Sequence, residues 1–381
     1  MKNMLTKTAL VGSLALMTAS IASAQTTVTG NLDLTYKAIS SDNAGVTAKT
    51  SSMRTFGKES QINIANKGSL NNGMTYAAGF SIELDGSDSA VANATNTSTS
   101  NSLAGAFNEN VYLDFISGST TFTIGADHIQ NPDYTITNLV GAADPDDLIS
   151  GINGKFALYS PAKNSAYQAY GFGIIQDFGA AKLSFNYTPD RTTGLANADT
   201  NGFNSTNATS IYDAGQSAYE IGLRGNFGNK ALDLGVFYSR SANGGEKGTG
   251  ETTVGNSSSD IIGKTVAASY AIGAAKVAYE RGEATSLQDV TTKSDSIGLA
   301  YAVNNNLSVG YTYVRTKSDA NTGNTMASAQ PNTKEKISQI SVGYNLGPVM
   351  VGATYGQVSD IGGMTTNGDG QALLVRTGVK F

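Results

Sequence analysis

The sequence predicts an all-β protein: a closed, 16-stranded antiparallel β-barrel that crosses a membrane. Apolar residues alternate with polar ones, in the period of a β-strand, from near the N-terminus to the last residue. Short turns alternate with long polar connections along the whole chain, as they do in an up-and-down barrel. The strand face opposite the apolar one is too hydrophilic for the packed core of a soluble protein.

The composition limits the chemistry that is possible. The chain has no cysteine and one histidine, His128, which excludes disulfides, thiolate metal sites and cysteine nucleophiles. Charged residues make up 14% of the chain, against roughly 25% in soluble domains. Acids outnumber bases by 30 to 25, whereas binding to nucleic acid requires a basic patch. We therefore expect no cofactor, no metal, no nucleic-acid partner and no enzymatic activity.

The first 24 residues have the features of an export signal. Lys2 and Lys7 supply the positive charge, residues 8–17 form a short, mostly apolar stretch, and Ala22-Ser23-Ala24 is a cleavage site of small residues. The apolar stretch is far shorter than the ~20 residues that a membrane-spanning helix needs. Cleavage before Gln25 leaves residues 25–381 as one barrel domain, with 23 bases, 30 acids and a net charge of −7.

The two ends of the mature chain show the alternation clearly. The first strand carries on one face Val28, Gly30, Leu32, Leu34 and Tyr36, and on the other Thr29, Asn31, Asp33, Thr35 and Lys37. The last strand carries on one face Leu373, Val375, Thr377, Val379 and Phe381, and on the other Leu374, Arg376, Gly378 and Lys380.

Between these strands we predict seven hairpins, with short turns near residues 67–72, 117–119, 178–180, 228–229, 273, 304–306 and 347–348. With the two terminal strands they make 16 strands. Eight longer connections, rich in Asn, Ser, Thr, Asp and Gly, are expected at roughly 40–58, 86–107, 128–165, 189–216, 241–259, 284–293, 317–335 and 359–370. The short turns then form one rim of the barrel and the long loops form the other.

The two faces of the strands indicate a membrane. The strands run about 9–12 residues, the length of a tilted transmembrane strand, whereas globular strands commonly have about 5–6. The inward positions are small or polar and suit a water-filled lumen: Gly79, Ser81, Thr121, Thr123, Ser184, Asn186, Thr265, Ser269, Gly310, Thr312, Ser341 and Gly343. Outward tyrosines near the loop ends fit an aromatic girdle: Tyr187, Tyr238, Tyr279, Tyr313 and Tyr355.

Three segments resemble the general Gram-negative trimeric porin family: residues 27–37, residues 59–84 (ESQINIANKGSLNNGMTYAAGFSIEL) and residues 110–127 (NVYLDFISGSTTFTIGAD). The resemblance implies an outer-membrane channel for passive diffusion of small hydrophilic solutes and ions in a Gram-negative bacterium. It also implies a homotrimer surrounded by lipid and lipopolysaccharide, with the third long loop folded into the lumen. The C-terminal strand ending in Phe381 would be the signal read by the outer-membrane barrel-assembly machinery.

The resemblance further implies that acids of the third loop narrow the channel opposite a basic wall. Residues 128–165 are the third and longest connection, although the family's usual loop signature is absent from them. The candidates for the acidic side are Asp127, Asp133, Asp144, Asp146 and Asp147. The alternative is that residues 143–147 are only a polar turn.

The candidate bases of the wall are Lys37, Arg54 and Lys58 around the first loop, and Lys182, Arg224 and Arg376 on later strands. Here the sequence departs from the family, because Gln61 and Glu109 stand where arginines commonly begin the second and fourth strands. Strand parity turns Glu109 outward unless a bulge intervenes. We therefore expect a wall with fewer bases than usual and a mild preference for cations.

Three other functions stay open. A substrate-specific channel of the same architecture would need a dense binding cluster or several aromatic residues in the lumen, for which Tyr112, Tyr167 and Phe237 are candidates. A barrel enzyme would need a base to activate its nucleophile, and His128 beside Asp127 is the histidine present. A surface protein without a pore, such as a β-solenoid, should show a short internal repeat.

Overall fold

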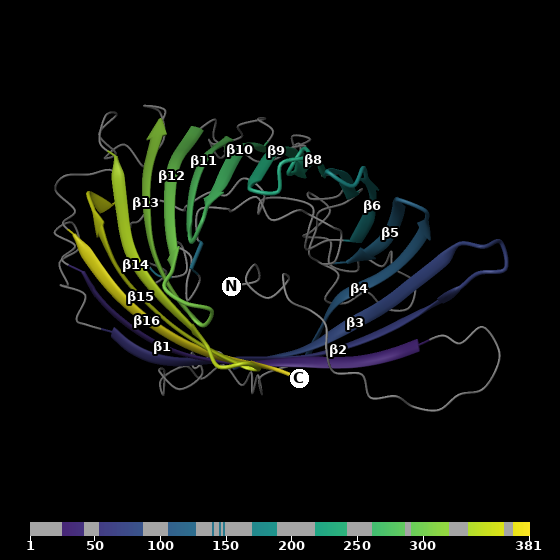
Figure 1. The fold of residues 1–381 in the computed structure, drawn as a ribbon, viewed down its shortest axis with the longest axis horizontal. Coiled ribbons are helices and arrows are strands. Elements are labelled where there is room, and N and C mark those ends of the chain that lie inside the picture. The colour runs from purple at the N-terminus through teal and green to yellow at the C-terminus, as the bar shows by residue number, and fades with distance from the viewer. Residues whose placement is uncertain are drawn as a thin grey trace, which may run out of the picture.

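The computed structural model describes residues 25–41, 53–86, 106–126, 139–140, 145, 148, 170–188, 218–241, 261–285, 291–319, 334–361 and 369–381. These residues form a closed antiparallel barrel of 16 strands (Figure 1). The strands are β1 (Gln25–Ser41), β2 (Met53–Ser69), β3 (Thr75–Gly86), β4 (Ala106–Ser117), β5 (Thr120–Ala126), β6 (Tyr170–Asp177), β7 (Ala181–Thr188), β8 (Ala218–Gly225), β9 (Leu232–Ser241), β10 (Ile261–Ile272), β11 (Ala275–Thr285), β12 (Thr291–Ala302), β13 (Leu307–Asp319), β14 (Glu335–Asn345), β15 (Val349–Ser359) and β16 (Gly370–Lys380). The predicted strand number and topology are confirmed.

Each strand pairs with its neighbours in sequence, and the ring closes where β1 pairs with β16. At this seam the last residue extends the ladder beyond β16. The Gly30 amide donates to the Phe381 carbonyl at 2.7 Å, and the Phe381 amide donates to the Gly30 carbonyl at 3.0 Å. Gly30 belongs to the outward face of β1, so Phe381 continues the outward row of β16, as the alternation predicts.

The short turns form because their residues suit tight reversals of the chain. Gly179, between β6 and β7, has φ +79°, in the left-handed region that favours glycine. Its amide donates to Oδ1 of Asp177 at 2.7 Å. Gly347, between β14 and β15, has φ +85° and donates in the same way to Oδ1 of Asn345 at 2.9 Å. These side-chain acceptors replace the ladder partner that the turn removes.

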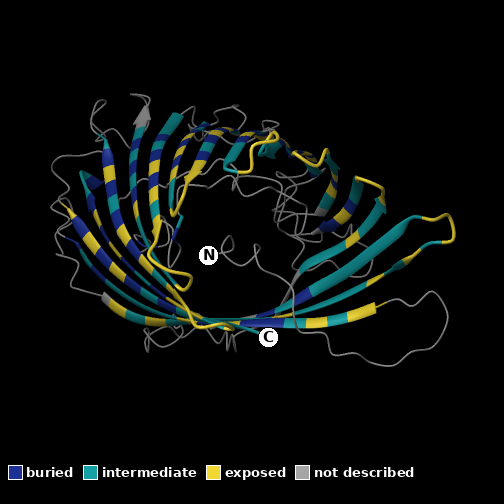
Figure 2. Cartoon of the chain, viewed as in Figure 1, coloured by how far each residue is buried: buried dark blue, intermediate teal, exposed yellow. Residues whose placement is uncertain are grey.

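The alternation of the sequence becomes two faces with opposite exposure (Figure 2). In β14, Ile340 is 59% exposed, whereas its neighbours Gln339 and Ser341 are 1% and 3% exposed. An apolar side chain with this exposure lies on the outer surface, and the polar side chains beside it point inward. The same division recurs in the other strands, so the barrel has an apolar exterior and a largely polar interior, as transmembrane barrels have.

The inner wall also holds an apolar cluster that the sequence analysis did not predict. It lies near the long-loop ends of β1 and β13–β16 and comprises Ile39, Val314, Ile337, Val358, Ile361, Ala372 and Leu374, with Leu148 packed among them. Leu148 is fully buried. A lumen-facing apolar patch of this kind would be unfavourable in water, and Leu148 removes it from water.

The expected strand limits were wrong near the N-terminus. β1 and β2 each have 17 residues and pair from Gln25↔Lys67 to Ile39↔Met53. Residues 53–58, expected in the first long loop, therefore belong to β2. Among the described residues, strand lengths range from 7 to 17, wider than the expected 9–12. No helix in the described part of the chain is long and apolar enough to cross a membrane.

Candidate functional site

The expected acidic side of the constriction lies outside the described residues: Asp127, Asp133, Asp144, Asp146 and Asp147, as well as His128 and Tyr167. Four residues from the same stretch of chain are described: Leu139, Val140, Pro145 and Leu148. Leu148 follows Asp147 directly in sequence, and its own contacts are described.

Three of these described residues contact the inner wall at separate places. Leu139 packs against Ala267 on β10 and Ala278 on β11. Val140 lies over Gly310 of β13, where an added Cβ would come within 2.8 Å of its Cγ2 atom. Leu148 lies over Gly356 of β15, where a Cβ would overlap its side chain. Glycine at these inward positions leaves the space that Val140 and Leu148 occupy.

Four of the six predicted basic residues point inward: Lys37, Lys182, Arg224 and Arg376. Their strand partners on the same face are inward residues, for example Lys37↔Thr55, Lys182↔Arg224 and Gly352↔Arg376. The structure does not gather them into one wall. Lys182 and Arg224 lie near the short turns, whereas Lys37 lies in the half of β1 nearer the long loops.

Three of these bases form ion pairs with inward acids. Arg376 makes a two-point contact with Asp33 across the β1–β16 seam, with Nε–Oδ1 3.2 Å and Nη2–Oδ2 2.9 Å. Arg224 contacts Asp233 of β9 in the same two-point manner, with Nε–Oδ1 2.9 Å. Lys182 lies 3.4 Å from Asp177. Pairing of this kind reduces the attraction of these bases for anions in the lumen.

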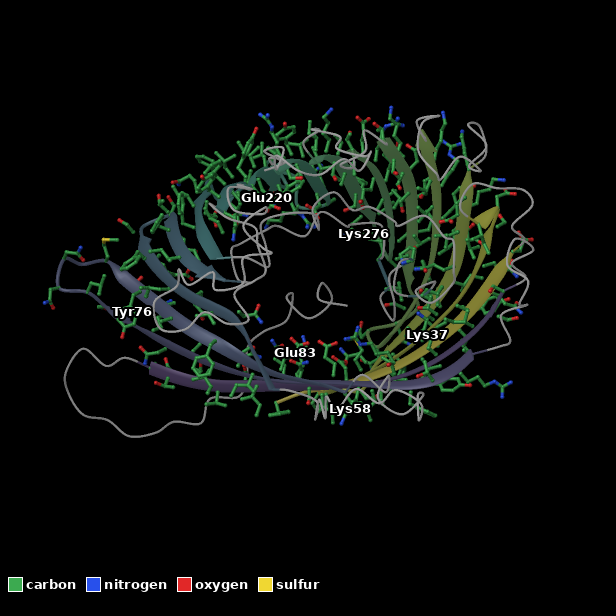
Figure 3. All side chains as sticks on the ribbon, turned by 180° about the vertical axis from the view of Figure 1, so that it is seen from behind. Lys37, Lys58, Tyr76, Glu83, Glu220 and Lys276 are labelled. Carbon is green, nitrogen blue, oxygen red and sulfur yellow. The ribbon has the colours of Figure 1, made fainter. Side chains whose placement is uncertain are left out.

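The expectation for Arg54 and Lys58 was wrong. The register pairs Arg54 with Ala38 and Lys58 with Leu34, and these partners lie on the apolar outer face of β1. In Figure 3, Lys58 points away from the interior, whereas Glu83 and Glu220 point into it. The error follows from the extra length of β2, because both residues were assigned to a loop and are governed by the parity of a strand.

Five inward glutamates were not among the predicted site residues: Glu59, Glu83, Glu220, Glu280 and Glu335. Each lies at the middle of its strand or in the half nearer the long loops. Four of them are at least 94% buried, because Glu83, Glu220, Glu280 and Glu335 are 5%, 1%, 6% and 1% exposed. Strand parity could have found them; Glu220, for example, stands between outward Tyr219 and Ile221.

A bulge interrupts β4 next to position 109. β3 and β4 shift register between Gly79 and Ser81, so that Gly79 pairs with Tyr112 but Ser81 pairs with position 109. Asn110 has φ +52° at this bulge, and its Nδ2 donates to Oγ of Ser81 at 3.0 Å. The bulge reverses the parity of β4 between Val111 and position 109, which is the exception that the sequence left open for this strand.

The described inner wall contains few aromatic residues. Tyr112 packs over Gly79, where an added Cβ would lie 2.8 Å from its ring. Phe237 faces inward between Gly222 and Thr265 and is 5% exposed. These two residues lie on separate strands and make no continuous aromatic path along the described wall.

Comparisons with known proteins agree with this architecture. A family model described as Gram-negative porin matches residues 8–360. The chain belongs to the Gram-negative porin family. It is therefore an outer-membrane porin, and its 16-stranded barrel is that of a channel protein.

Solved porin structures share this fold. An anion-selective porin from Comamonas acidovorans matches with a TM-score of 0.63 at 14% identity, over 94% of this chain and 100% of that chain. A trimer form of OmpT, an outer membrane protein of Vibrio cholerae, matches with a TM-score of 0.55 at 14% identity, over 94% of this chain and 99% of that chain. A mutant of the Rhodopseudomonas blastica porin matches with a TM-score of 0.56 at 14% identity, over 94% of this chain and 100% of that chain. A comparison with curated proteins finds no match.

Proposed function

We propose that this porin is a water-filled, non-enzymatic channel for passive diffusion of small hydrophilic solutes and ions, with a mild preference for cations. The observation that carries the preference is the distribution of charge on the inner wall. In the described strand halves nearer the long loops, Glu59, Glu83, Glu220 and Glu335 face inward, and Lys37 is the inward base. Glu280 adds a carboxylate at mid-height on β11.

Electrostatics supports a cation preference for such a wall. Unit charges 4 Å apart interact by about 4 kcal/mol at an effective dielectric constant near 20, so carboxylates lining a narrow lumen raise the local concentration of cations. The bases Lys182, Arg224 and Arg376 are each matched by a nearby acid and contribute less to the opposite preference. An anion-selective porin shares the fold, so the fold alone does not determine the sign of selectivity.

We also propose that the third loop enters the lumen and adds Asp144, Asp146 and Asp147 to this acidic surface. The support is the wall contact of Leu148, the residue that follows Asp147, together with those of Leu139 and Val140. Asp127 and Asp133 precede these contacts in the same segment. On this proposal, the loop acids and the wall glutamates attract cations along the same path through the lumen.

Reversal potentials in a KCl gradient across a planar bilayer test the selectivity. The wild-type channel should prefer K⁺. A Glu83→Gln, Glu220→Gln, Glu280→Gln variant should shift the potential toward Cl⁻, and so should an Asp144→Asn, Asp146→Asn, Asp147→Asn variant. Lys58→Gln is the matched control, because Lys58 lies on the outer face and its loss should leave the potential unchanged.

Each outcome of this measurement has a separate meaning. An unchanged potential in the glutamate variant would contradict the role of the wall. An unchanged potential in the loop variant would mean that residues 143–147 form a surface turn. Saturable block of the current by one solute would indicate a substrate-specific channel instead of general diffusion.

We further propose a homotrimer, for which the trimer form of OmpT is the support. Removal of residues 1–24 on export, and recognition of Phe381 by the barrel-assembly machinery, belong to the same proposal. The positions of Gln25 at the start of β1 and of Phe381 at the barrel seam are consistent with it.

A further inference from the structure

The charge on the inner wall changes sign along the axis of the barrel. The last four residues of the strands at their short-turn ends carry, among the inward side chains that the structure describes, five bases and three acids: Lys67, Lys182, Arg224, Lys276, Lys380, Asp114, Asp177 and Asp233. We call these eight residues the base zone.

Farther from the short turns, the described inward side chains are mainly acidic. They comprise five glutamates and one lysine: Glu59, Glu83, Glu220, Glu280, Glu335 and Lys37. We call these six residues the acid zone. Asp33 and Arg376 are left out of both zones, because their charges match within one ion pair. The described wall is therefore negative toward the long loops and positive at the short turns.

Two lysines give the base zone its excess of positive charge. Arg224 is paired with Asp233, and Lys182 is paired with Asp177. Lys67 and Lys276 have no ion-pair partner among the described residues. Lys67 is exposed and Lys276 is half-buried, so mobile anions in the lumen can approach both ammonium groups.

The same order of charge occurs within single strands. On β11, Glu280 follows Lys276 by four residues, and on β8, Glu220 precedes Arg224 by four residues. An even spacing keeps each acid and base on the same face, about 13 Å apart along the strand. Because the two strands run in opposite directions, the acid is nearer the long loops in both. The screening length is about 10 Å in 0.1 M salt, so ions in the lumen meet two separate regions of opposite charge.

The order of the zones affects how ions fill the lumen under voltage. The acid zone concentrates cations, and the base zone concentrates anions. When the long-loop side is positive, cations enter through the acid zone and anions enter through the base zone, so ions of both signs accumulate. When the long-loop side is negative, both kinds of ion are drawn outward. Their replacements must then pass a zone of their own sign, and the lumen is depleted of ions.

We propose that the channel rectifies ionic current and conducts more when the long-loop side is positive than when it is negative. The inference rests on the proposed function as an open channel and goes beyond its cation preference. That preference depends on the total charge of the wall, whereas rectification depends on the order of the charges along the axis. The direction of the larger current follows from the acid zone lying toward the long loops.

Currents through single channels in a planar bilayer, with the same KCl concentration on both sides, test the proposal. In about 0.1 M KCl, the wild-type current at about 100 mV should be at least about 1.5-fold larger with the long-loop side positive. In 1 M KCl the screening length falls to about 3 Å, and the two currents should become nearly equal.

The orientation of the channel is fixed by a chemical marker. The chain has no cysteine, so an Asn71→Cys change in the exposed turn between β2 and β3 marks the short-turn side. A thiol reagent linked to a polymer too large for the lumen should change the current only from the compartment that faces the short turns. This result assigns the sign of the voltage for each inserted channel.

Two variants separate rectification from selectivity. A Lys67→Gln, Lys276→Gln variant should bring the ratio of the two currents close to one, while its reversal potential in a KCl gradient moves further toward K⁺. A Lys276→Glu, Glu280→Lys variant reverses the order of charge on β11 at constant total charge. It should lower the ratio with little change in reversal potential. Arg54→Gln, Lys58→Gln is the matched control, because both bases lie on the outer face, and it should rectify as the wild type does.

Equal wild-type currents at the two polarities in 0.1 M KCl would overturn the proposal. Asymmetry that persists in 1 M KCl, or that is unchanged in the Lys67→Gln, Lys276→Gln variant, would also overturn it, because the cause would then not be these charges. If the exchange variant on β11 does not fold, the double glutamine variant decides. A cation-selective channel that does not rectify would refute this inference alone, and a rectifying channel that prefers anions would refute only the proposed cation preference.

Discussion

At the scale of single residues, a buried ion pair closes the barrel. Asp33 and Arg376 join β1 to β16, and their side chains are only 5% and 9% exposed. Gly378 is the inward neighbour of Arg376 on β16, and a Cβ there would collide with Oδ1 of Asp33. The ion pair therefore depends on Gly378, because the lack of a side chain at position 378 gives the Asp33 carboxylate room to reach the Arg376 guanidinium.

Asp33→Ala should destabilise the barrel strongly, by about 3–5 kcal/mol, because it leaves a buried guanidinium without its carboxylate. An Asp33→Leu, Arg376→Met variant should recover much of the loss, since it removes both charges. Samples are heated to a series of temperatures in sodium dodecyl sulfate and then run on a gel. The temperature at which the band of the folded barrel disappears measures the effect. Lys182→Met is the control, because Lys182 pairs with Asp177 in an exposed position near a short turn and surface pairs contribute about 0–1 kcal/mol. Equal shifts for Asp33→Ala and the control would contradict the argument.

At the scale of elements, parity predicted most of the wall and failed in two particular places. It turned Lys37 inward, and the register agrees, because Lys37 pairs with inward Thr55. The registers also turn Lys182, Arg224 and Arg376 inward. Parity was not applied to Arg54 and Lys58, because β2 continues through residues whose polarity suggested a loop. The bulge at Asn110 could not be located from the sequence, because a strand with one extra residue has the same composition as a strand without it.

The apolar cluster inside the lumen also escaped prediction, and the reason is physical. Inward Ile337, Val358 and Leu374 contradict the rule that a porin lumen is polar, unless another segment covers them. Leu148 is that cover in the described structure, and it precedes Ile337, Val358 and Leu374 by 189, 210 and 226 residues in the chain. Contacts of such separation are not visible in a local pattern. The sequence therefore predicted the barrel and its faces, and did not predict that Leu148 lies against the inner wall.

Leu148→Ala should release this attachment while leaving the barrel folded. Leucine-to-alanine changes at fully buried sites cost about 2–5 kcal/mol, and here the cost falls on a contact between a segment and the wall. Single-channel recordings should show more current noise, and limited proteolysis should cut within residues 127–165 sooner than in the wild type. Leu346→Ala serves as the control, since Leu346 is 55% exposed beside a short turn. Quiet currents and wild-type proteolysis in Leu148→Ala would mean that other contacts hold the segment.

At the scale of the whole molecule, the charge on the inner wall follows from one arrangement of the strands. The period of two divides the chain into an outer face for lipid and an inner face for water, and the alternation of turns and loops separates the two rims. In the described strand halves nearer the long loops, glutamates outnumber Lys37 on the inner face, whereas most of the bases lie on the outer face. Nearer the short turns, the inward face also carries bases, among them Lys182, Arg224 and Lys276.

Processing should leave Gln25 as the first residue of the mature protein. The motif Ala22-Ser23-Ala24 precedes it. Cleavage of a signal peptide requires small residues at the positions of Ala22 and Ala24. Edman sequencing or intact mass of protein from the outer membrane checks the position. Material that retains any of residues 1–24 would contradict it, and an Ala24→Leu variant should accumulate as a larger precursor.

Deleting Phe381 should prevent assembly of the whole barrel more than it weakens the finished one. The residue adds two hydrogen bonds to the seam through Gly30, each with a net contribution of roughly 0.5–1.5 kcal/mol. Its ring lies over Gly30, where an added Cβ would come 2.5 Å from Cζ, and it remains 61% exposed. A loss of this size is small beside a 16-stranded ladder, so a large defect would have to arise before closure, when the ring is available for recognition.

The deletion variant should accumulate as protease-sensitive protein in the periplasm, whereas Phe381→Tyr, which keeps an aromatic end, should assemble. Purified deletion variant refolded in detergent should still form a barrel, and normal amounts of it in the outer membrane would show that Phe381 is not the recognised feature.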